Sequence, residues 1–496
     1  MTRHFIRRQF QYTLVRSEIN SYILTQKKLT NVPPSLPTDL IGGHFRSFRK
    51  DPTGFLTRLS KLGDVGAFRM GPQQAFFINN PEYIRDIFVV NAEKFVKGRA
   101  LQRAKTLLGN GLLTSEGEFH LRQRRMIQPA FHRTRIAEYA RSMVDYGERL
   151  SNEWRDGDVR DIDREMMRLT LQIVGKTLFG ADVEDDADKV GRAMTTIVEL
   201  FNFLLLPFSD WLRNLPLPQS KRFRNARNTL DNIIYGMIAE RRKTGSNKSD
   251  LLSMLLAARD EDDGKPMTDE QIRDEALTLF LAGHETTANA LTWTWFLLSQ
   301  NPEKETKLHA ELNRVLGGDA TVEERVESAT CEGTLVNTRV SAIRLPTIDD
   351  VPNLKYTEAV LAESMRLYPP AWAIGRLAVE PHEIRGFRIP VGALILISPY
   401  VTQRDGRYWP QPDEFIPERW ETQSIKEAGQ KNIYFPFGGG VRRCIGESFA
   451  WTEGILLIAT LARKWKLKLT PEQRIGLQPM ITLRPRFGMK IKISTR

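Results

Sequence analysis

Apolar residues recur at helical spacing through most of the chain. Between about residues 92 and 317 they return every three or four positions, as in Arg135–Leu150. The clearest helix is predicted to begin at Thr268, which forms a capping-box pattern with Gln271, and to run without proline to Gln300. At 1.5 Å per residue, this helix spans on the order of 50 Å and would cross a whole globular body.

Strand-like patterns occupy two shorter regions. The segment Asp64–Asn80 is predicted to form two short strands around a turn at Gly71 and Pro72. After Pro369 the chain becomes rich in short β-type segments, such as Glu383–Ser398. The pattern therefore predicts a mainly α-helical protein with a smaller β-rich region.

The composition is that of an ordinary folded protein with a large core. Charged residues make up 27% of the chain and hydrophobic residues 41%, while glycine and proline are scattered. The length of 496 residues alone suggests about three domains. However, no repeat or linker separates them, so one large mixed domain and several small domains both fit the composition.

The first 28 residues are basic, with Glu18 as the only acid, and cationic positions alternate with aromatic or aliphatic ones. Three interpretations stay open: a helix that lies on a membrane surface, a transit peptide such as a mitochondrial one, and a plain solvated leader. Pro33, Pro34 and Pro37 end this leader, which we place at residues 1–34. No run of 18 apolar residues occurs, which argues against a transmembrane helix.

The net charge of +12 favours acidic partners or a well-solvated basic surface. Nucleic acid is not expected as a partner, because no DNA- or RNA-reading motif accompanies the charge. The two cysteines, Cys331 and Cys444, are too few for a disulfide scaffold and indicate a reducing compartment. We therefore predict a cytoplasmic protein, and we interpret Cys331 as incidental because its segment is polar.

A glycine-rich loop presents Cys444 just before an apolar helical run. The glycines of Gly438–Gly440 permit positive φ and close approach of the backbone. The periodicity from Glu447 onward places the cysteine near a helix N-terminus, where amide donors favour a thiolate. The preceding Arg442–Arg443 adds positive charge. The loop is therefore a candidate for holding a sulfur ligand against an iron and a planar cofactor, whereas a C-x-G pattern alone would more often be a packing cysteine.

The full spacing F-G-x-G-x-R-x-C-x-G resembles the haem-binding loop of the cytochrome P450 family. The matching residues are Phe437, Gly438, Gly440, Arg442, Cys444 and Gly446. The resemblance covers the chain from about residue 35 to its end. It implies the cytochrome P450 fold, with one long central helix crossing over haem b and with Cys444 as the iron ligand. It also implies a single haem-thiolate domain at residues 35–496, with Phe437, Gly438 and Gly446 beside the haem.

A second motif, A-G-H-E-T-T from Ala282, resembles the oxygen-activating segment of the same family. The resemblance implies that Ala282 and Gly283 lie beside the haem, with room left by the glycine. It also implies that Glu285 and Thr286 help to deliver protons. From the residues alone, a solvated helical face or threonines bonded back to the preceding turn would explain the same run. His284 is not expected to be a ligand.

A third motif, E-S-M-R, places Glu363 and Arg366 three residues apart on a helix predicted to end before Tyr368. A surface ion pair is the simpler interpretation of this spacing. The family resemblance instead implies a buried pair, joined by Arg419 of the P-E-R-W segment, with a structural role in haem retention.

The resemblance also implies cations for the two haem propionates. The candidate residues are His120, Arg124, Arg376 and Arg442. The family often has tryptophan where this chain has His120, so the assignment of His120 rests on its ability to donate a hydrogen bond.

Two further features concern the surface and the substrate. The segment 317–349 is longer than the family usually has between these helices, and its polar composition predicts a surface insertion.

The segments Leu101–Leu113, Phe201–Leu212 and Ala371–Ile374 correspond to pocket-lining segments of the family and are mainly apolar. They favour a lipophilic substrate, such as a fatty acid, an alkane or a terpenoid-like compound.

The function that the resemblance implies is that of a monooxygenase, which inserts one oxygen atom from O2 into a C–H bond. The chain ends soon after Cys444 and shows no fused reductase, so a ferredoxin or flavodoxin with its reductase is the expected electron donor. A haem-thiolate isomerase, dehydratase or peroxide-driven enzyme is one alternative, but it would not need Glu285 and Thr286. A haem sensor without an enzymatic reaction is the other.

Overall fold

The computed structural model describes residues 32–39, 42–180, 189–193, 196–197, 199–200, 217–245, 250–317 and 343–496. The described residues form two compact units, each considered by itself. The first comprises the residues up to Arg103, Ala373–Pro410 and Gly429–Arg443, and the second comprises Ala104–Trp372, Gln411–Ala428 and Cys444–Arg496. Most of the predicted leader, Cys331, the segment Phe201–Leu212 and most of the predicted insertion lie outside the described residues. The prediction of a single domain stays a prediction.

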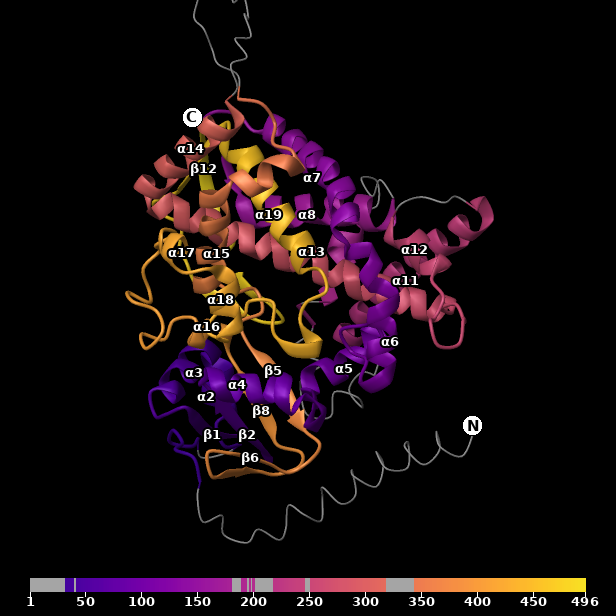
Figure 1. Cartoon of the computed structure of the whole chain (residues 1–496), viewed down its shortest axis with the longest axis vertical. Coiled ribbons are helices and arrows are strands. Elements are labelled where there is room, and N and C mark those ends of the chain that lie inside the picture. Colours follow the sequence, from indigo (N-terminus) through magenta and orange to yellow (C-terminus); the bar gives the residue numbers. More distant parts are fainter. Residues whose placement is uncertain are drawn as a thin grey trace, which may run out of the picture. The chain divides into compact units, whose positions relative to one another are not determined.

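A five-stranded sheet lies in the first unit (Figure 1). Its strands, in spatial order, are β1 (Val65–Met70), β2 (Gln73–Ile78), β8 (Leu394–Ile397), β5 (Ile374–Ala378) and β3 (Phe95–Lys97). β1 and β2 form an antiparallel hairpin with Val65 opposite Ile78, and Gly71 begins the turn with a φ of +63°. The predicted hairpin is therefore confirmed. β2 also pairs in parallel with β8, which comes from a distant part of the chain.

Aromatic and β-branched side chains fill the core against this sheet, as expected for strands with a buried face. Phe76 and Ile395 lie in this cluster, together with Phe88 and with Phe435 from the start of the cysteine loop. The hairpin of β6 (His382–Ile384) and β7 (Phe387–Ile389) adds further apolar side chains. The other elements of the unit are α2 (Phe45–Lys50), α3 (Pro52–Ser60), α4 (Pro81–Arg85), the π-helix η1 (Asp86–Val90), and the 3₁₀-helices η2 (Ala92–Lys94) and η5 (Gly440–Arg442), with α16 (Pro399–Thr402).

The second unit is mainly helical. Its described helices include α6 (Gly117–Ile127), η3 (Gln128–Phe131), α7 (Arg133–Glu153), α8 (Ile162–Phe179), α11 (Pro218–Thr244), α12 (Leu251–Ala257), α13 (Asp269–Gln300), α14 (Pro302–Leu316), η4 (Ile348–Asn353), α15 (Lys355–Leu367), α17 (Arg419–Thr422) and α19 (Glu447–Ala462). Two small sheets accompany them, formed by β4 (Val159–Asp161), β12 (Lys490–Thr495) and β9 (Trp465–Leu469), and by β10 (Leu477–Pro479) and β11 (Leu483–Pro485). The helices α5 (Arg99–Leu108) and α18 (Ile425–Gln430) each contain residues of both units.

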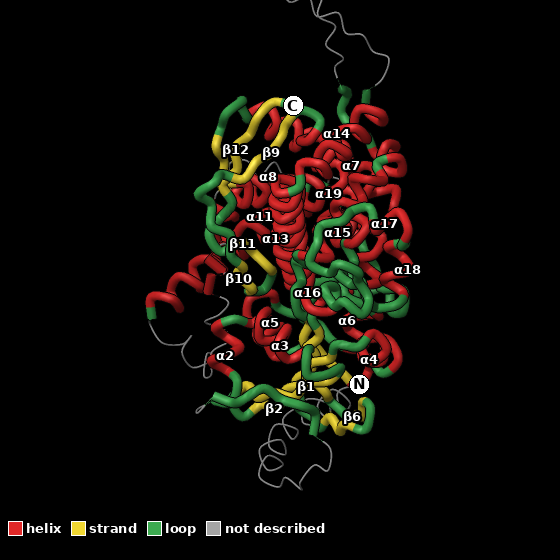
Figure 2. The backbone as a smooth tube through the Cα atoms, turned by 90° about the vertical axis from the view of Figure 1, so that its left-hand side faces the viewer, coloured by secondary structure: helices red, strands yellow, loops and turns green. Residues whose placement is uncertain are grey.

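The long helix α13 runs through the second unit, with α8, α15 and α19 beside it (Figure 2). Its start is fixed by the predicted capping box between Thr268 and Gln271, and it ends at Gln300 as predicted. Nearly every residue beyond its first turn is buried, which is the pattern of a helix surrounded by other helices. At its C-terminal half, the Trp293 ring stacks on Tyr368 with 4.2 Å between ring centres.

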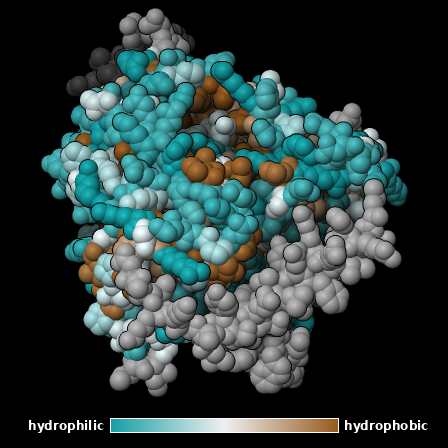
Figure 3. Space-filling view, turned by 60° about the horizontal axis from the view of Figure 1, so that its bottom comes forward, coloured by the Kyte–Doolittle hydropathy of each residue, from teal (hydrophilic) through white to brown (hydrophobic). Residues whose placement is uncertain are grey.

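Figure 3 shows hydrophilic side chains over much of one face, with hydrophobic patches between them. Within the described residues, no helix is both long enough and apolar enough to span a bilayer.

Candidate active site

The glycines of the cysteine loop have the conformations that the sequence predicts. Gly438 and Gly440 have φ values of +72° and +63°, which favour glycine, whereas Gly439 is extended. A side chain on Gly440 would collide with the carbonyl oxygen of Phe88, and one on Gly439 would lie 2.8 Å from the ring of Phe88. The loop therefore packs directly against η1, and two of its glycines are required by this close approach.

Arg376 lies on β5 beside the same phenylalanine. Its guanidinium carbon is 5.2 Å from the centre of the Phe88 ring, and its Nη1 donates to the Gly375 carbonyl across 3.1 Å. Phe437, Gly438 and Arg442 are half-buried in the same unit. These are the positions of four predicted cofactor-binding residues in the first unit.

Cys444 belongs to the second unit and lies just before α19, as predicted. Its side chain is exposed, and Gly446 is the N-cap residue of the helix. A Cβ atom on Gly446 would lie 4.0 Å from the Cys444 Sγ and 3.6 Å from the ring of Phe131, both ordinary contacts. The described protein atoms therefore do not require a glycine at this position, and its predicted role beside a planar cofactor stays a prediction.

Arg124 and His120 lie one turn apart on α6 and so share a face of that helix. Burial lowers the pKa of Arg124, and the negative charge of the Cys444 sulfur opposes this shift. His120 is buried, and its Nδ1 donates to the Leu112 carbonyl across 3.1 Å. While Nδ1 keeps this bond, His120 can donate through Nε2 only in its doubly protonated form, because a neutral imidazole carries only one N–H.

The loop before α6 is fixed by two acids of α13 that the motifs did not single out. The Asn110 amide donates to Asp274 Oδ2 across 2.7 Å, and the Leu112 amide donates to Glu275 Oε2 across 2.8 Å. These hydrogen bonds satisfy loop amides and position the carbonyl that accepts from His120.

The three least buried residues in the middle of α13 are Ala282, Gly283 and Thr286. Ala282 and Thr286 are one turn apart, so they share one face of a helix that is otherwise buried. The predicted place of Gly283 beside the haem stays a prediction, and the described protein atoms give the glycine a second role. A Cβ atom there would lie 3.1 Å from Val174 of α8, so the glycine permits close packing of these two helices.

Glu285 and Thr286 do not bond to each other through their side chains. The Thr286 hydroxyl donates to the Ala282 carbonyl across 2.7 Å, which is the back-bonded arrangement left open by the sequence. The buried Glu285 carboxylate instead accepts from Thr482 and from Arg484, whose Nε lies 2.9 Å from Glu285 Oε1. No sequence pattern pointed to these two partners, because they lie almost two hundred positions away along the chain.

His284, the residue between these motif positions, donates through Nδ1 to the Phe280 carbonyl across 3.0 Å. Burial lowers the pKa of His284, so the ring is neutral near pH 7. This is the geometry of a satisfied core histidine, in agreement with the expectation that it is not a ligand.

Glu363, Arg366 and Arg419 meet as predicted. Neither side chain of the Glu363–Arg366 pair has exposed surface, and Arg419 Nε donates to Glu363 Oε1 across 2.8 Å. Trp420 is an additional member, because its Nε1 donates to Glu363 Oε2 across 3.0 Å. The alternative of a surface ion pair is therefore wrong.

Glu453 of α19 is a buried acid that the sequence motifs did not single out. Burial raises the pKa of Glu453 to about 8, and the nearby Thr287 hydroxyl opposes this shift only in part. The side chain is therefore mainly a neutral carboxylic acid at pH 7. Its position in an apolar helical run gave no indication of its protonation state.

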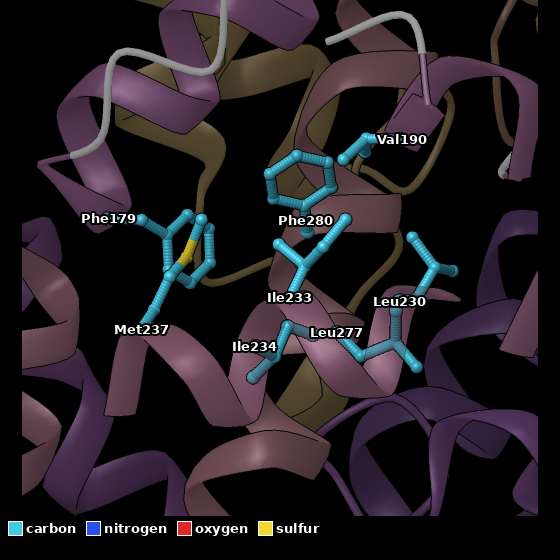
Figure 4. A pocket seen from close by; sticks show the side chains of 8 residues that line it. All are labelled: Phe179, Val190, Leu230, Ile233, Ile234, Met237, Leu277 and Phe280. Carbon is cyan, nitrogen blue, oxygen red and sulfur yellow. The ribbon is translucent and has the colours of Figure 1, made fainter. Parts of the chain in front are cut away.

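A small apolar cavity of about 20 Å³ lies in the second unit, against α13. Its lining residues surround one space in Figure 4 and are Phe179, Val190, Leu230, Ile233, Ile234, Met237, Leu277 and Phe280. The cavity suits apolar groups.

Comparison with known proteins identifies the family of this chain. A model of the cytochrome P450 family matches residues 32–492. Cyclooctatin synthase of Streptomyces melanosporofaciens is 37% identical over 92% of this chain and 93% of its own length. Cyclooctat-9-en-7-ol 5-monooxygenase of the same organism is 34% identical, covering 88% and 89% of the two chains. Pentalenene oxygenase of Streptomyces avermitilis is 33% identical, covering 92% and 95%.

The chain therefore belongs to the cytochrome P450 family. It has the mainly α-helical fold of that family with a β-rich region, and it is an oxidoreductase of the monooxygenase class. The cofactor of the family is haem b bound by a cysteine thiolate. The residues of the second unit fit this group. Cys444 offers an exposed sulfur at a helix N-terminus. The negative charge of that sulfur raises the pKa of Arg124, against the effect of burial.

Proposed function

We propose that this chain inserts one oxygen atom from O2 into a C–H bond of a terpenoid-like substrate, with electrons from a separate redox protein. Two of the similar proteins carry the names cyclooctat-9-en-7-ol 5-monooxygenase and pentalenene oxygenase, which support a terpenoid-like compound over a fatty acid or an alkane.

The observation that carries the proposal is the exposed Cys444 at the N-terminus of α19. We propose that its thiolate is the iron ligand. When bound, the thiolate-ligated haem supplies the oxygen-activating redox chemistry. Arg124 and His120 of the second unit, and Arg376 and Arg442 of the first, are the proposed partners of the propionates. Phe437, Gly438, Gly446, Ala282 and Gly283 are proposed to lie against the haem.

Thr286 and Glu285 are the proposed proton-handling groups. The Thr286 hydroxyl donates to Ala282 and keeps its lone pairs, so it can accept a hydrogen bond without rearrangement. To donate a proton toward the proposed haem site, the hydroxyl must first give up its hydrogen bond to the Ala282 carbonyl. The Glu285 carboxylate is buried and charge-paired, so it must loosen its bonds to Thr482 and Arg484 before it moves a proton.

The electron donor is proposed to be a ferredoxin or flavodoxin with its reductase. Both are commonly acidic proteins, and the net charge of +12 suits association with an acidic partner. A cytoplasmic location is proposed on the basis of the low cysteine content.

The decisive experiment is the carbon monoxide difference spectrum of the dithionite-reduced protein, measured on the wild type and on Cys444→Ser. We expect a strongly red-shifted Soret band in the wild type and its loss in the variant, because only a thiolate ligand gives this shift. A wild type without this band, or a band that survives the substitution, would contradict the assignment of Cys444. A spin-state titration with terpenoids, and with fatty acids as the comparison, then tests the substrate class.

A further inference from the structure

A basic surface lies on the small three-stranded sheet of the second unit, whose strands run in the order β4, β12 and β9. The inner face of this sheet packs on α13, α8 and α19 (Figure 2). Its side chains include Leu467, Ile491 and Ile493, which are at most 2% exposed. Successive side chains of a strand point to opposite faces, so the residues between these three form the outer face of the sheet.

The outer face carries lysines on two neighbouring strands. Lys492 of β12 lies directly opposite Lys468 of β9 in their antiparallel pairing. Lys490 of β12 and Lys466 of β9 each lie two residues away on the same face, and all four lysines are exposed. Like charges directly opposite each other destabilise a sheet. The Lys468–Lys492 pair therefore costs folding stability unless an external anion neutralises it.

The acids near this face are engaged elsewhere in the protein. Asp161 of β4 lies opposite Lys490, but it accepts from a backbone amide across 3.0 Å. Asp156 accepts from a backbone amide of β12 across 2.7 Å. Burial raises the pKa of Glu305 on α14, and the charge of Lys466 opposes this shift. Within the described part of the chain, none of the four lysines of the outer face forms an ion pair.

Protection of the sheet edge does not account for all of these lysines. Natural sheets often carry lysine on an edge strand, where it discourages pairing with another chain. This explanation suits Lys466 and Lys468, because β9 is at the edge of the sheet, but not Lys490 and Lys492, because β12 is the central strand. The positive charge also extends beyond the sheet, since residues 463–496 contain ten lysines and arginines and a single acid.

Exposed apolar side chains lie among these cations. Phe487, between β11 and β12 in the chain, is 51% exposed, and the guanidinium carbons of Arg474 and Arg486 lie 5.8 Å and 5.4 Å from the centre of its ring. Val159 of β4, which lies opposite Lys492, is 56% exposed. Apolar side chains that project from a basic surface are typical of proteins that bind at the lipid–water interface.

This surface is separate from the proposed iron ligand. The helix α19 begins just after Cys444 and ends at Ala462, directly before β9. Its 16 residues span about 24 Å. The sheet therefore lies at the opposite end of α19 from Cys444, so an electron donor docked on the sheet would not be beside the proposed haem.

We propose that the outer face of the β4–β12–β9 sheet, together with Phe487, docks on the surface of an anionic phospholipid bilayer. The lysines contact the headgroup phosphates, and the Phe487 ring enters the interfacial layer. Each lysine or arginine close to such a surface raises the partition coefficient by about five-fold. The inference goes beyond the proposed reaction and does not depend on it.

Cosedimentation of the purified full chain with vesicles tests the docking. Vesicles of equal parts phosphatidylcholine and phosphatidylglycerol should bind the wild type, and vesicles of phosphatidylcholine alone should bind it far less. Lys468→Gln/Lys492→Gln should lower the partition coefficient by about ten-fold or more. The matched control is Lys50→Gln/Lys61→Gln, which removes the same charge from exposed lysines of the first unit and should bind like the wild type.

Two results of this comparison overturn the proposal. Unchanged partition of the sheet variant would mean that other residues, such as the basic leader, carry the binding. An equal loss in the sheet variant and the control would mean that net charge alone decides it. A wild type that ignores the vesicles, but binds heparin through Lys468 and Lys492, would assign the face to an acidic macromolecule and would also overturn the membrane proposal.

Thermal stability separates lost docking from misfolding. Lys468→Gln/Lys492→Gln removes a repulsion, so its melting temperature should equal or exceed that of the wild type while vesicle binding falls. Lys468→Glu should pair with Lys492, which also preserves stability, and should weaken binding further. Phe487→Ser should weaken binding several-fold and make the remainder more sensitive to salt, because only charge contacts are left. A Phe487→Ser protein that binds like the wild type overturns the role of the ring.

Discussion

Glu363 accepts two hydrogen bonds from the Arg366 guanidinium, at 2.9 Å from Nε and 2.8 Å from Nη2, and neither side chain has exposed surface. The carboxylate also accepts from Arg419, from Trp420 and from the Ile416 amide. A buried ion pair is tolerable when its members are hydrogen-bonded as fully as this one.

Glu363→Gln should therefore destabilise the protein strongly. The neutral amide leaves the Arg366 charge buried without its counter-ion, which costs about 3–5 kcal/mol. We expect a lower urea midpoint and lower haem content after purification. The matched control is Glu358→Gln on the same helix, whose partner Lys355 is largely exposed; its effect should stay under about 1 kcal/mol. Equal stability of the two variants would contradict the structural role of Glu363.

Thr286→Ala should separate oxygen insertion from electron consumption. The variant removes the hydroxyl proposed to handle protons, but it removes only a back-bond to Ala282, so the fold should be preserved. We expect about ten-fold less product per electron pair, with a matching rise in hydrogen peroxide. Thr286→Ser keeps a hydroxyl and should retain much of the coupling. Unchanged coupling in the alanine variant would favour a peroxide-driven enzyme or a sensor.

Gly440→Ala should disturb the cysteine loop. The residue has a φ of +63°, and a methyl group would collide with the Phe88 carbonyl. The backbone conformation alone costs about 1–2 kcal/mol for a residue with a side chain. Haem content and thermal stability should both fall. Gly406→Ala is the matched control in the same unit, because nothing lies within 4 Å of an added Cβ there. Similar losses in both variants would show that the close approach to Phe88 is not the cause.

Glu453→Gln should change how stability depends on pH. Burial raises the pKa of Glu453 from 4.5 to about 8, so the folded state holds a proton that the unfolded state has released. The stabilisation is fully present below about pH 4.5 and is lost as the pH rises toward 8, by roughly 1.4 kcal/mol per pH unit. The variant should lack this decline and should exceed the wild type in stability at about pH 8.

Urea unfolding at several pH values measures this difference, with the exposed Glu427→Gln as the control. Parallel pH profiles for the wild type and Glu453→Gln would show that Glu453 does not carry a buried proton.

The local features of the fold were predictable because they depend on neighbouring residues. The hairpin around Gly71 follows from turn chemistry, and the start of α13 follows from the Thr268 capping box. The position of Cys444 at a helix N-terminus follows from the apolar period after Glu447.

The long-range pairings were not predictable from these patterns. β2 pairs with β8 as well as with its hairpin partner β1, because the packing of the whole sheet decides which strands pair. The same limit applies to the close packing of Gly283 against Val174, which comes from another helix.

The sequence by itself determined the candidate residues, each through spacing that local structure preserves: Cys444, Glu285 and Thr286 for chemistry, and the Glu363–Arg366 pair for a structural role. Only the tertiary structure decided their electrostatic state. Arg484 was brought to Glu285, and Glu453 was removed from water, by the packing of distant segments. Burial and distant charges set the protonation of an acid, and neither is a property of its neighbours in the chain.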